Sequence, residues 1–321
     1  MKRFGQEVFV TIESKDNVGI LNAAGLRIDF EVKELSGFSR AKITIWNLNE
    51  ETIGNLIGGN QDHYISLTTR LHGGSEFQLV DGFYISNSID HKQLPDTITT
   101  LYCYSGLKKE VLEKQVSAVA PKGSLKEQLK ALRIAAKFKG EFKTSTFPKG
   151  LLEYVPDRPS DMPMNGSVSQ VLNALGKEYS FRSHTIGDDI YLMYMPDLTQ
   201  VTLTDLDNRT AITLDTNNMR ANPKLSPAQL QINSNLDGNI RPTAVVDISK
   251  LLTAEGNFDE VALQVAADFA QQSVSGYKKF QVIEVTHSGS NYTGTWNTQA
   301  SCVAPKQGAT APIGGTSWFN Q

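Results

Sequence analysis

The 321-residue sequence has few cysteines, no long apolar run and little net charge. Its two cysteines, Cys103 and Cys302, both lie in strand-like segments. A disulfide between them stays open, although two buried free thiols are the preferred interpretation. No stretch approaches the roughly 18 consecutive apolar residues of a membrane-spanning helix. The formal net charge of −3 gives no global argument for binding nucleic acid or membranes.

Signals for export and catalysis are also missing. The opening residues MKRFGQEVFV lack the apolar core of a signal peptide, so we expect a protein made in the cytoplasm. No histidine stands at metal-ligand spacing to another histidine or to a cysteine, and there is no GxSxG, P-loop or GxGxxG motif after a strand. The acid pairs Glu50–Glu51, Asp188–Asp189 and Asp259–Glu260 stand at turns or helix starts, where capping explains them better than catalysis. We therefore expect no enzyme, no metal and no cofactor.

What the sequence does contain is strand-like alternation in its first and last thirds. In LRIDFEVK, the apolar residues Leu26, Ile28, Phe30 and Val32 fall on one face and charged residues on the other. This pattern is typical of a strand with one solvated side. Similar runs are EVFVTIE, AKITIW, HYISLTTRL, FQLVDGFYIS and TITTLYCYS in the first third, and AITL, QLQIN, TAVVDIS, FQVIEVTHS and TWNTQASCVA in the last.

Helix signals are fewer. After AKITIW, Asn49 is a good N-cap for a short helix with an apolar stripe of Ile53, Leu56 and Ile57. SLKEQLKALRIAAKF and SVSQVLNALGKEY each open with a capping box, and we expect the second helix to end near Gly176. FPKGLLEYVPDRPSDMPM between them is expected to be irregular, and DDIYLMYM to be a strand. FDEVALQVAADFAQQ predicts a further helix in the last third.

These patterns predict an α+β, β-rich chain in four parts. Residues 1–106 form an N-terminal β domain, 107–200 a small α+β middle region and 201–303 a C-terminal β-rich region. Residues 304–321 are rich in proline, glycine and small side chains, so we expect a flexible arm. Its aromatic pair, Trp318 and Phe319, is our candidate partner interface, with simple disorder of the arm as the alternative.

One segment departs from the low net charge of the chain. Residues 101–150 contain eleven lysines or arginines and four glutamates, a net charge of +7. Two interpretations stay open: a solvated helix face, or an electrostatic face for nucleic acid or an acidic partner. Aromatic residues are not interleaved at stacking spacing there, which disfavours single-strand recognition.

Particular residues resemble a known family. A strand ending in I-x-I-W-N-L-N, followed by a T-x-x-x-L helix, resembles the N-terminal domain of baseplate hub proteins from contractile-tailed bacteriophages. The matching residues are Ile43, Ile45, Asn47, Leu48, Asn49, Thr52 and Leu56. Later, Asn239-Ile240-Arg241-Pro242 is similar to part of the family's L-x-P-x-I-x-P-G segment, with Asp237 where proline is usual and Thr243 in place of the final glycine. The closing hairpin is similar at Val285, His287, Gly289, Gly294 and Trp296.

The resemblance implies tail-tube-like split β-barrel domains with short flanking helices, in the first and last thirds. It implies a structural baseplate hub subunit, located in the tail baseplate of a virion and made in the cytoplasm of a host bacterium. A homotrimeric ring of such subunits would join the tail tube to the central spike and surround the DNA path. The implied partners are the chain itself, the tail tube or a tube-adaptor protein, the central spike, the tape measure protein and other baseplate proteins. It implies no membrane and no specific nucleic-acid recognition. Two other functions stay open: a spike-associated cell-wall hydrolase, and a β-rich binding module outside tails.

Overall fold

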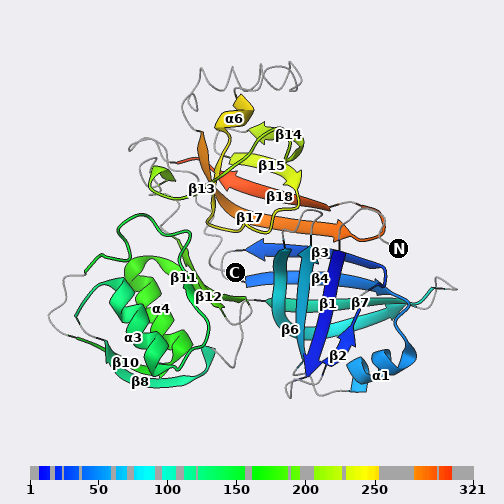
Figure 1. Ribbon diagram of the computed structural model, residues 1–321, viewed down its shortest axis with the longest axis horizontal. Helices are drawn as coiled ribbons and strands as arrows, with labels where there is room; N and C mark the ends of the chain where they lie inside the picture. Colours follow the sequence, from blue (N-terminus) through cyan, green and yellow to red (C-terminus); the bar gives the residue numbers. More distant parts are fainter. Residues whose placement is uncertain are drawn as a thin grey trace.

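The computed structural model shows a large β-sheet and a smaller α+β region beside it (Figure 1). It describes residues 7–14, 19–23, 25–35, 38–58, 63–70, 76–90, 96–105, 112–120, 122–155, 161–186, 189–195, 206–225, 229–252, 278–294 and 296–305. The α+β, β-rich class expected from the sequence is confirmed. None of the described helices has both the length and the apolar composition needed to cross a membrane.

The first third forms seven strands and one short helix. Their bounds are β1 (Glu7–Ser14), β2 (Gly19–Asn22), β3 (Ile28–Leu35), β4 (Phe38–Trp46), α1 (Glu50–Gly58), β5 (His63–Arg70), β6 (Glu76–Asp90) and β7 (Ile98–Ser105). In the view of Figure 1, the strands β1, β2 and β6 cross β3, β4 and β7. The apolar residues of each strand meet in one core between them, which includes Val10, Ile28, Ile43, Ile65 and Leu101. The alternation seen in the sequence therefore specifies which face of each strand is buried.

The last third continues the same sheet. Its elements are β13 (Ala211–Thr213), β14 (Met219–Leu225), β15 (Gln229–Asn235), β16 (Val245–Asp247), α6 (Ser249–Leu252), β17 (Lys279–Ser290) and β18 (Trp296–Val303). Among the described strands, the sheet runs β14-β15-β18-β17-β3-β4-β7-β6-β5-β1-β2, with β13 and β16 joined at β17. The pairing of β17 with β3 thus makes one sheet out of strands from both ends of the chain.

The middle region builds its own core. It contains β8 (Gln115–Ala120), α3 (Leu125–Ala135), β9 (Phe142–Lys143), β10 (Met162–Ser167), α4 (Val168–Tyr179), β11 (Phe181–Ile186) and β12 (Asp189–Tyr194). Both capping boxes are confirmed: the Ser124 side chain accepts from the Glu127 amide and the Ser167 side chain from the Gln170 amide. Gln128 Nε2 donates to the Tyr179 hydroxyl at 3.0 Å, which links the two helices.

Two expectations for the middle region were wrong in detail. The proline-rich segment ends in a strand: among the described strands, β10 pairs with β8 alone, and Pro163 can sit on such an edge strand without removing a ladder hydrogen bond. Helix α4 continues past Gly176 to Tyr179 and is capped by Ser180 in the left-handed region. Gly176 is needed for close packing instead, since a Cβ there would lie 2.3 Å from the Phe181 carbonyl oxygen.

The residues Asn47, Leu48 and Asn49 follow β4 directly, and each has a different structural role. Asn47 is left-handed (φ 59°), its Nδ2 donates to Asp96 Oδ1 at 3.0 Å, and its Oδ1 accepts from the Thr97 amide at 3.1 Å. Leu48 is buried in the core of the first third. Asn49 is the N-cap expected from the sequence, with its Oδ1 accepting from the Thr52 amide at 2.7 Å. Ile53 packs on the same core, whereas the side chains of Leu56 and Ile57 lie outside the described part.

Replacing Asn47 with alanine is expected to lower the free energy of unfolding by about 1–3 kcal/mol, because alanine loses both side-chain hydrogen bonds and tolerates positive φ less well. Asn47→Gly keeps the backbone conformation and should cost less. Chemical denaturation of both variants measures the difference. Equal losses would show that backbone strain contributes nothing at this position.

Candidate functional site at the seam of the sheet

The antiparallel pairing of β3 with β17 is called the seam here, because it joins strands from the two ends of the chain. It extends from the Leu35–Glu284 pair to the Asp29–Ser290 pair. An ion pair of 2.6 Å between Lys33 Nζ and Glu284 Oε1 crosses it on the solvent side. Each end of the seam is further fixed by an arginine, and these two arginines come from different parts of the chain.

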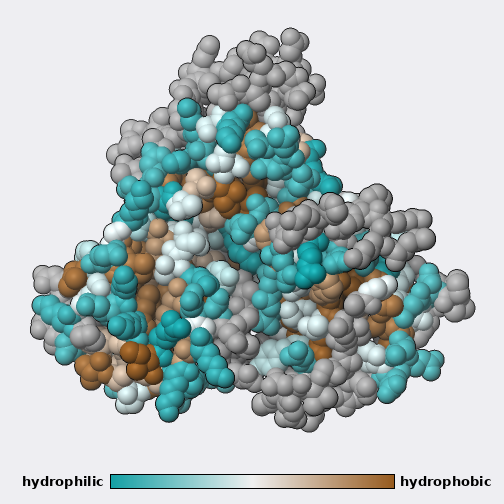
Figure 2. All heavy atoms as spheres, viewed as in Figure 1, coloured by the Kyte–Doolittle hydropathy of each residue, from teal (hydrophilic) through white to brown (hydrophobic). Residues whose placement is uncertain are grey.

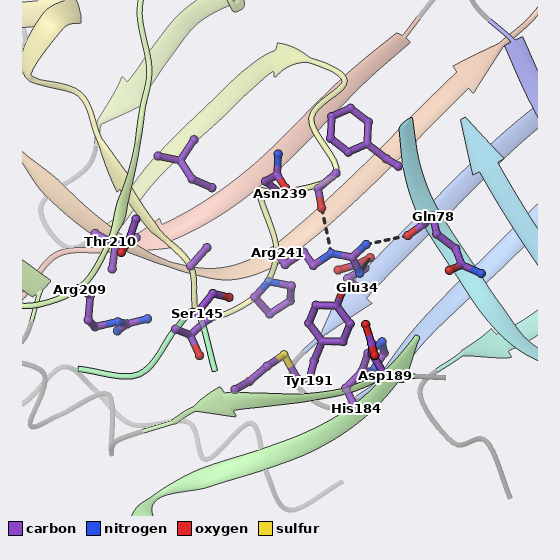
Figure 3. A pocket seen from close by; sticks show the side chains of 18 of the residues that line it. Glu34, Gln78, Ser145, His184, Asp189, Tyr191, Arg209, Thr210, Asn239 and Arg241 are labelled. Carbon is purple, nitrogen blue, oxygen red and sulfur yellow. Dashed lines mark hydrogen bonds and ion pairs between the residues drawn. The ribbon is translucent and has the colours of Figure 1, made fainter. Parts of the chain in front are cut away.

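Arg241 fixes one end of the seam by using all three of its guanidinium nitrogens (Figure 3). Nη1 donates to Glu34 Oε1 at 3.0 Å and Nη2 to the Gln78 carbonyl at 2.8 Å, which ties the residue to β3 and β6. Nε donates to the Gly238 carbonyl at 2.9 Å within its own loop. The guanidinium carbon lies 5.9 Å from the ring centroid of Tyr191, on β12 of the middle region. One side chain thus contacts all three parts of the chain.

Burial gives this end of the seam unusual protonation properties. It raises the pKa of Glu34, while the charge of Arg241 opposes that rise. His287, also fully buried, has its pKa lowered to about 3, chiefly by burial and then by the charge of Arg241, with the Ile240 backbone opposing. Its Nδ1 lies 2.9 Å from the Thr298 hydroxyl oxygen, which accepts from the Asp237 amide at 3.0 Å. At neutral pH, His287 is therefore an uncharged part of the packing.

Arg27 fixes the other end. Its guanidinium carbon lies 3.9 Å from the ring centroid of Trp46 and 4.6 Å from that of Tyr292, in the turn between β17 and β18. In the same turn, Asn291 Oδ1 accepts from the Ile28 amide at 2.8 Å and Nδ2 donates to the Leu26 carbonyl at 2.7 Å. The expected hairpin turn is confirmed, and its Asn291 side chain is hydrogen-bonded to the backbone at the start of β3.

One face of the sheet is polar across six strands. Cross-strand partners place one row through Asn233, Gln299, Thr286, Lys33, Arg40 and Tyr104, and a second row through Asn235, Asn297, Ser288, Glu31, Lys42 and Tyr102. We call this surface the polar face. It consists of Gln231, Asn233, Asn235, Asn297, Gln299, Ser301, Glu284, Thr286, Ser288, Asp29, Glu31, Lys33, Arg40, Lys42, Thr44, Tyr102 and Tyr104, all at least partly exposed.

The polar face carries balanced charge and is hollowed on one side. Three cations, Lys33, Arg40 and Lys42, match the three carboxylates Asp29, Glu31 and Glu284. The part from β15 and β18 consists of amides and a hydroxyl, Ser301, without a charged group. A hollow of about 420 Å³ lies over this part, and its lining also includes one cation, Lys224 of β14, and one carboxylate, Glu284 of β17. The surface thus offers hydrogen bonds without a net charge.

A second cavity, of about 380 Å³, lies where the three parts of the chain meet (Figure 3). It brings Glu34 and Asp189 together with His184, Arg209 and Arg241. Its carboxylates have structural partners: Glu34 bonds Arg241, and Asp189 accepts from the Glu141 amide at 2.8 Å and pairs with Lys143 at 3.4 Å. Within the described ranges, no three histidine, cysteine or acidic side chains are grouped to hold a metal.

The candidate residues from the sequence are placed as follows. Trp318 and Phe319, the pair Asp259–Glu260 and the helix expected at FDEVALQVAADFAQQ lie outside the described residues. Glu50 and Glu51 are in the first turn of α1, as capping predicts. Cys103 and Cys302 are buried free thiols, and burial raises both pKa values. Glu34 was not among the predicted site residues, although it continues the buried positions Ile28, Phe30 and Val32 of β3.

Thr243, which replaces a glycine of the resembling family, adopts a backbone suited to glycine. Its φ is +72°, and its hydroxyl is a buried group without a hydrogen-bond partner in the described part. Its amide still donates to Val282 and its carbonyl accepts from Arg209.

We expect Thr243→Gly to raise the free energy of unfolding by about 1 kcal/mol, because it relieves strain and removes the buried hydroxyl. Thr243→Ala removes the hydroxyl but keeps the Cβ, so its gain should be smaller. Thermal unfolding of the two variants tests this, and a lower midpoint for Thr243→Gly would contradict it.

Comparison with known proteins gives structural matches alone. No family model and no curated protein sequence matches the chain. A type VI secretion system component of E. coli, described as similar to T4 bacteriophage tail proteins, is 11% identical with a TM-score of 0.44, over 88% of this chain and 74% of that chain.

Two tail proteins also match. The tail protein from Neisseria meningitidis MC58 is 9% identical (TM-score 0.46; 93% of this chain, 97% of that chain). The 43 kDa tail protein of prophage MuSo2 from Shewanella oneidensis is 8% identical (TM-score 0.46; 93% and 99%). These matches are tail and secretion-system proteins, the class that the sequence resemblance suggests. All three TM-scores lie below 0.5.

Proposed function

We propose that this chain is a structural hub subunit of a phage tail or a related contractile machine. Three copies form a ring that joins the tail tube to the central spike and surrounds the DNA path. The observation that supports this most is the polar face, since one sheet presents a single charge-balanced surface made by both ends of the chain. Two residues that carry the family resemblance, Asn47 and Arg241, form structural hydrogen bonds, Asn47 at the end of β4 and Arg241 at one end of the seam.

The polar face has the chemistry that a DNA passage needs. Duplex DNA binds strongly where a protein supplies unpaired cations, because each neutralised phosphate releases counterions. On the polar face, three carboxylates balance the three cations, and the amides of β15 and β18 add no charge. A ring lined by this surface lets DNA slide without being held.

The sheet edges suit a closed ring better than an open filament. The seam already covers one edge of β3 within the same chain, so β14 and β2 end the main path of the described sheet, and the three-residue strand β13 ends the branch through β16. β14 contains Pro223 and shifts register against β15, while β2 has four residues. Irregular and short edges resist unlimited strand addition. Contacts between copies are then limited in number, as ring closure requires.

The proposed partners are the tail tube or a tube adaptor, the central spike, the tape measure protein and other baseplate proteins. Within this proposal, the arm with Trp318 and Phe319 anchors to the spike or to a neighbouring subunit. Deleting residues 306–321 should then leave the fold intact and weaken assembly.

A reconstruction of the assembled tail tip tests the proposal. We expect three copies around the tube axis, with the polar face toward that axis. Six copies at this level, or a position away from the axis, would refute it. Gln299→Lys adds a cation to the polar face and should slow DNA release from assembled particles. Asn173→Lys, which adds the same charge on the exposed side of α4, serves as the matched control.

A further inference from the structure

Helix α3 carries a row of cations on its solvent side. Lys126, Lys130 and Arg133 follow each other at spacings of four and three residues, so they lie on one helical face. Lys137 continues the row just past the C-cap. All four side chains are exposed, and we call them the cation stripe. The opposite side of the helix is buried through Leu125, Gln128, Leu129 and Leu132.

The cation stripe is not neutralised within the described part of the chain. None of its four members forms an ion pair there, and the one acidic residue of α3, Glu127, accepts from the Ser124 amide at 2.8 Å and the Ser124 hydroxyl at 3.2 Å. Nearby Glu141 bonds Lys143 at 2.6 Å, and Arg133 acts on its pKa as a minor cause. Like charges three and four residues apart destabilise a helix. The helix dipole favours Arg133 and Lys137 at the C-terminal end of α3, but the stripe as a whole presents positive charge to solvent without an acidic partner in the described part of the chain.

An exposed apolar residue lies beside the stripe. Ile134 is 68% exposed, next to Arg133 in the sequence and on the solvent side of α3. Figure 2 shows hydrophobic side chains among hydrophilic ones over the part of the molecule that holds α3, α4, β8 and β10. A phosphate backbone has no apolar group to cover an isoleucine, whereas a protein segment does.

We propose that the cation stripe and Ile134 form a docking surface for an acidic protein segment that carries an apolar side chain. Complementary charge steers such a segment to the stripe, and burial of Ile134 supplies contact area. The surface lies on the middle region, away from the polar face. The proposal therefore holds whether or not the chain forms a ring around DNA.

The test uses the full chain and three probes in an NMR titration. The first is a helical peptide of about 16 residues, with glutamates and a leucine on one face, long enough to cover the turns of α3. The second has serine in place of that leucine, and the third is duplex DNA of mixed sequence. Lys130→Glu with Arg133→Glu reverses two of the four charges of the stripe, and Lys177→Glu with Lys224→Glu makes the same change of net charge elsewhere.

We expect the leucine peptide to bind more tightly than the serine peptide and DNA, with shifts centred on α3. The stripe variant should lose about tenfold in affinity, since each surface charge contact is modest. Its melting temperature should change little, because each of the two new carboxylates gains a lysine four residues away, Lys126 or Lys137, while the two carboxylates repel each other across three residues. Ile134→Ser should remove the preference for leucine. Tighter binding of DNA than of either peptide, or equal losses in the stripe variant and its charge-matched control, would overturn the proposal.

Discussion

Replacing Arg241 with methionine is expected to lower the free energy of unfolding by about 3–5 kcal/mol at neutral pH, because Glu34 would remain as a buried charge without its partner. Glu34 is 5% exposed, and its carboxylate receives the Nη1 hydrogen bond. The substitution also removes the bonds to the Gln78 and Gly238 carbonyls. Denaturant unfolding of the variant beside the wild type measures the loss.

The loss should shrink as the pH falls. Burial already raises the pKa of Glu34, and without Arg241 that pKa rises further. A carboxyl with a raised pKa binds a proton in the folded state before the unfolded state does. The variant therefore regains stability as pH decreases through the folded pKa, and the gain levels off near the ordinary value of about 4.3.

A second variant separates Glu34 from His287, whose pKa also responds to Arg241. In Arg241→Met with Glu34→Gln, the buried charge is gone, so stability at neutral pH should recover in part. Any pH dependence of stability that remains in this double variant comes from His287 or from groups that the wild type also contains. A loss in the single variant that stays constant between about pH 8 and pH 4 would show that Glu34 is not the uncompensated charge.

The sequence predicts the strands and helices with strong local patterns and misses those without. Alternation identifies β3 and β4, and the capping boxes locate the starts of α3 and α4. Short strands such as β2 and β9 carry too few residues for a period to show. Gly176 was mistaken for a helix stop because sequence alone does not reveal a carbonyl packed against that position.

The seam could not be predicted, because local patterns define strands but not their partners. Glu34 and Arg241 are 207 residues apart in the sequence. The alternation of apolar and polar residues in β3 places Glu34 on the buried face, but it does not show which residue pairs with its carboxylate. Both rows of the polar face likewise depend on the register between β17 and β3. The resemblance pointed to the segment around Arg241 but not to the contacts it makes.

Trp296 joins the core of the first third although it belongs to the last third. It is 1% exposed and its Nε1 donates to the Ser290 carbonyl at 2.8 Å. Its ring meets Phe30 edge to face at 5.7 Å between centroids, across the seam. Gly289 permits this contact, since a Cβ there would lie 2.6 Å from the Phe30 ring. The two ends of the chain therefore share buried apolar surface as well as hydrogen bonds.

Trp296→Ala is expected to lower the free energy of unfolding by about 3–5 kcal/mol, because the indole leaves a cavity between the two ends of the chain. Phe280→Ala is the matched control, as Phe280 is equally buried but lies in the core of the last third alone. Hydrogen exchange distinguishes them: Trp296→Ala should speed exchange in β3 and β4 as well as β18, and Phe280→Ala should act mainly around β16 and β17. Faster exchange confined to the last third in both variants would mean that the seam does not couple the two ends. In a ring subunit, that coupling keeps the polar face continuous, so its loss would also remove the support for a passage lined by both ends.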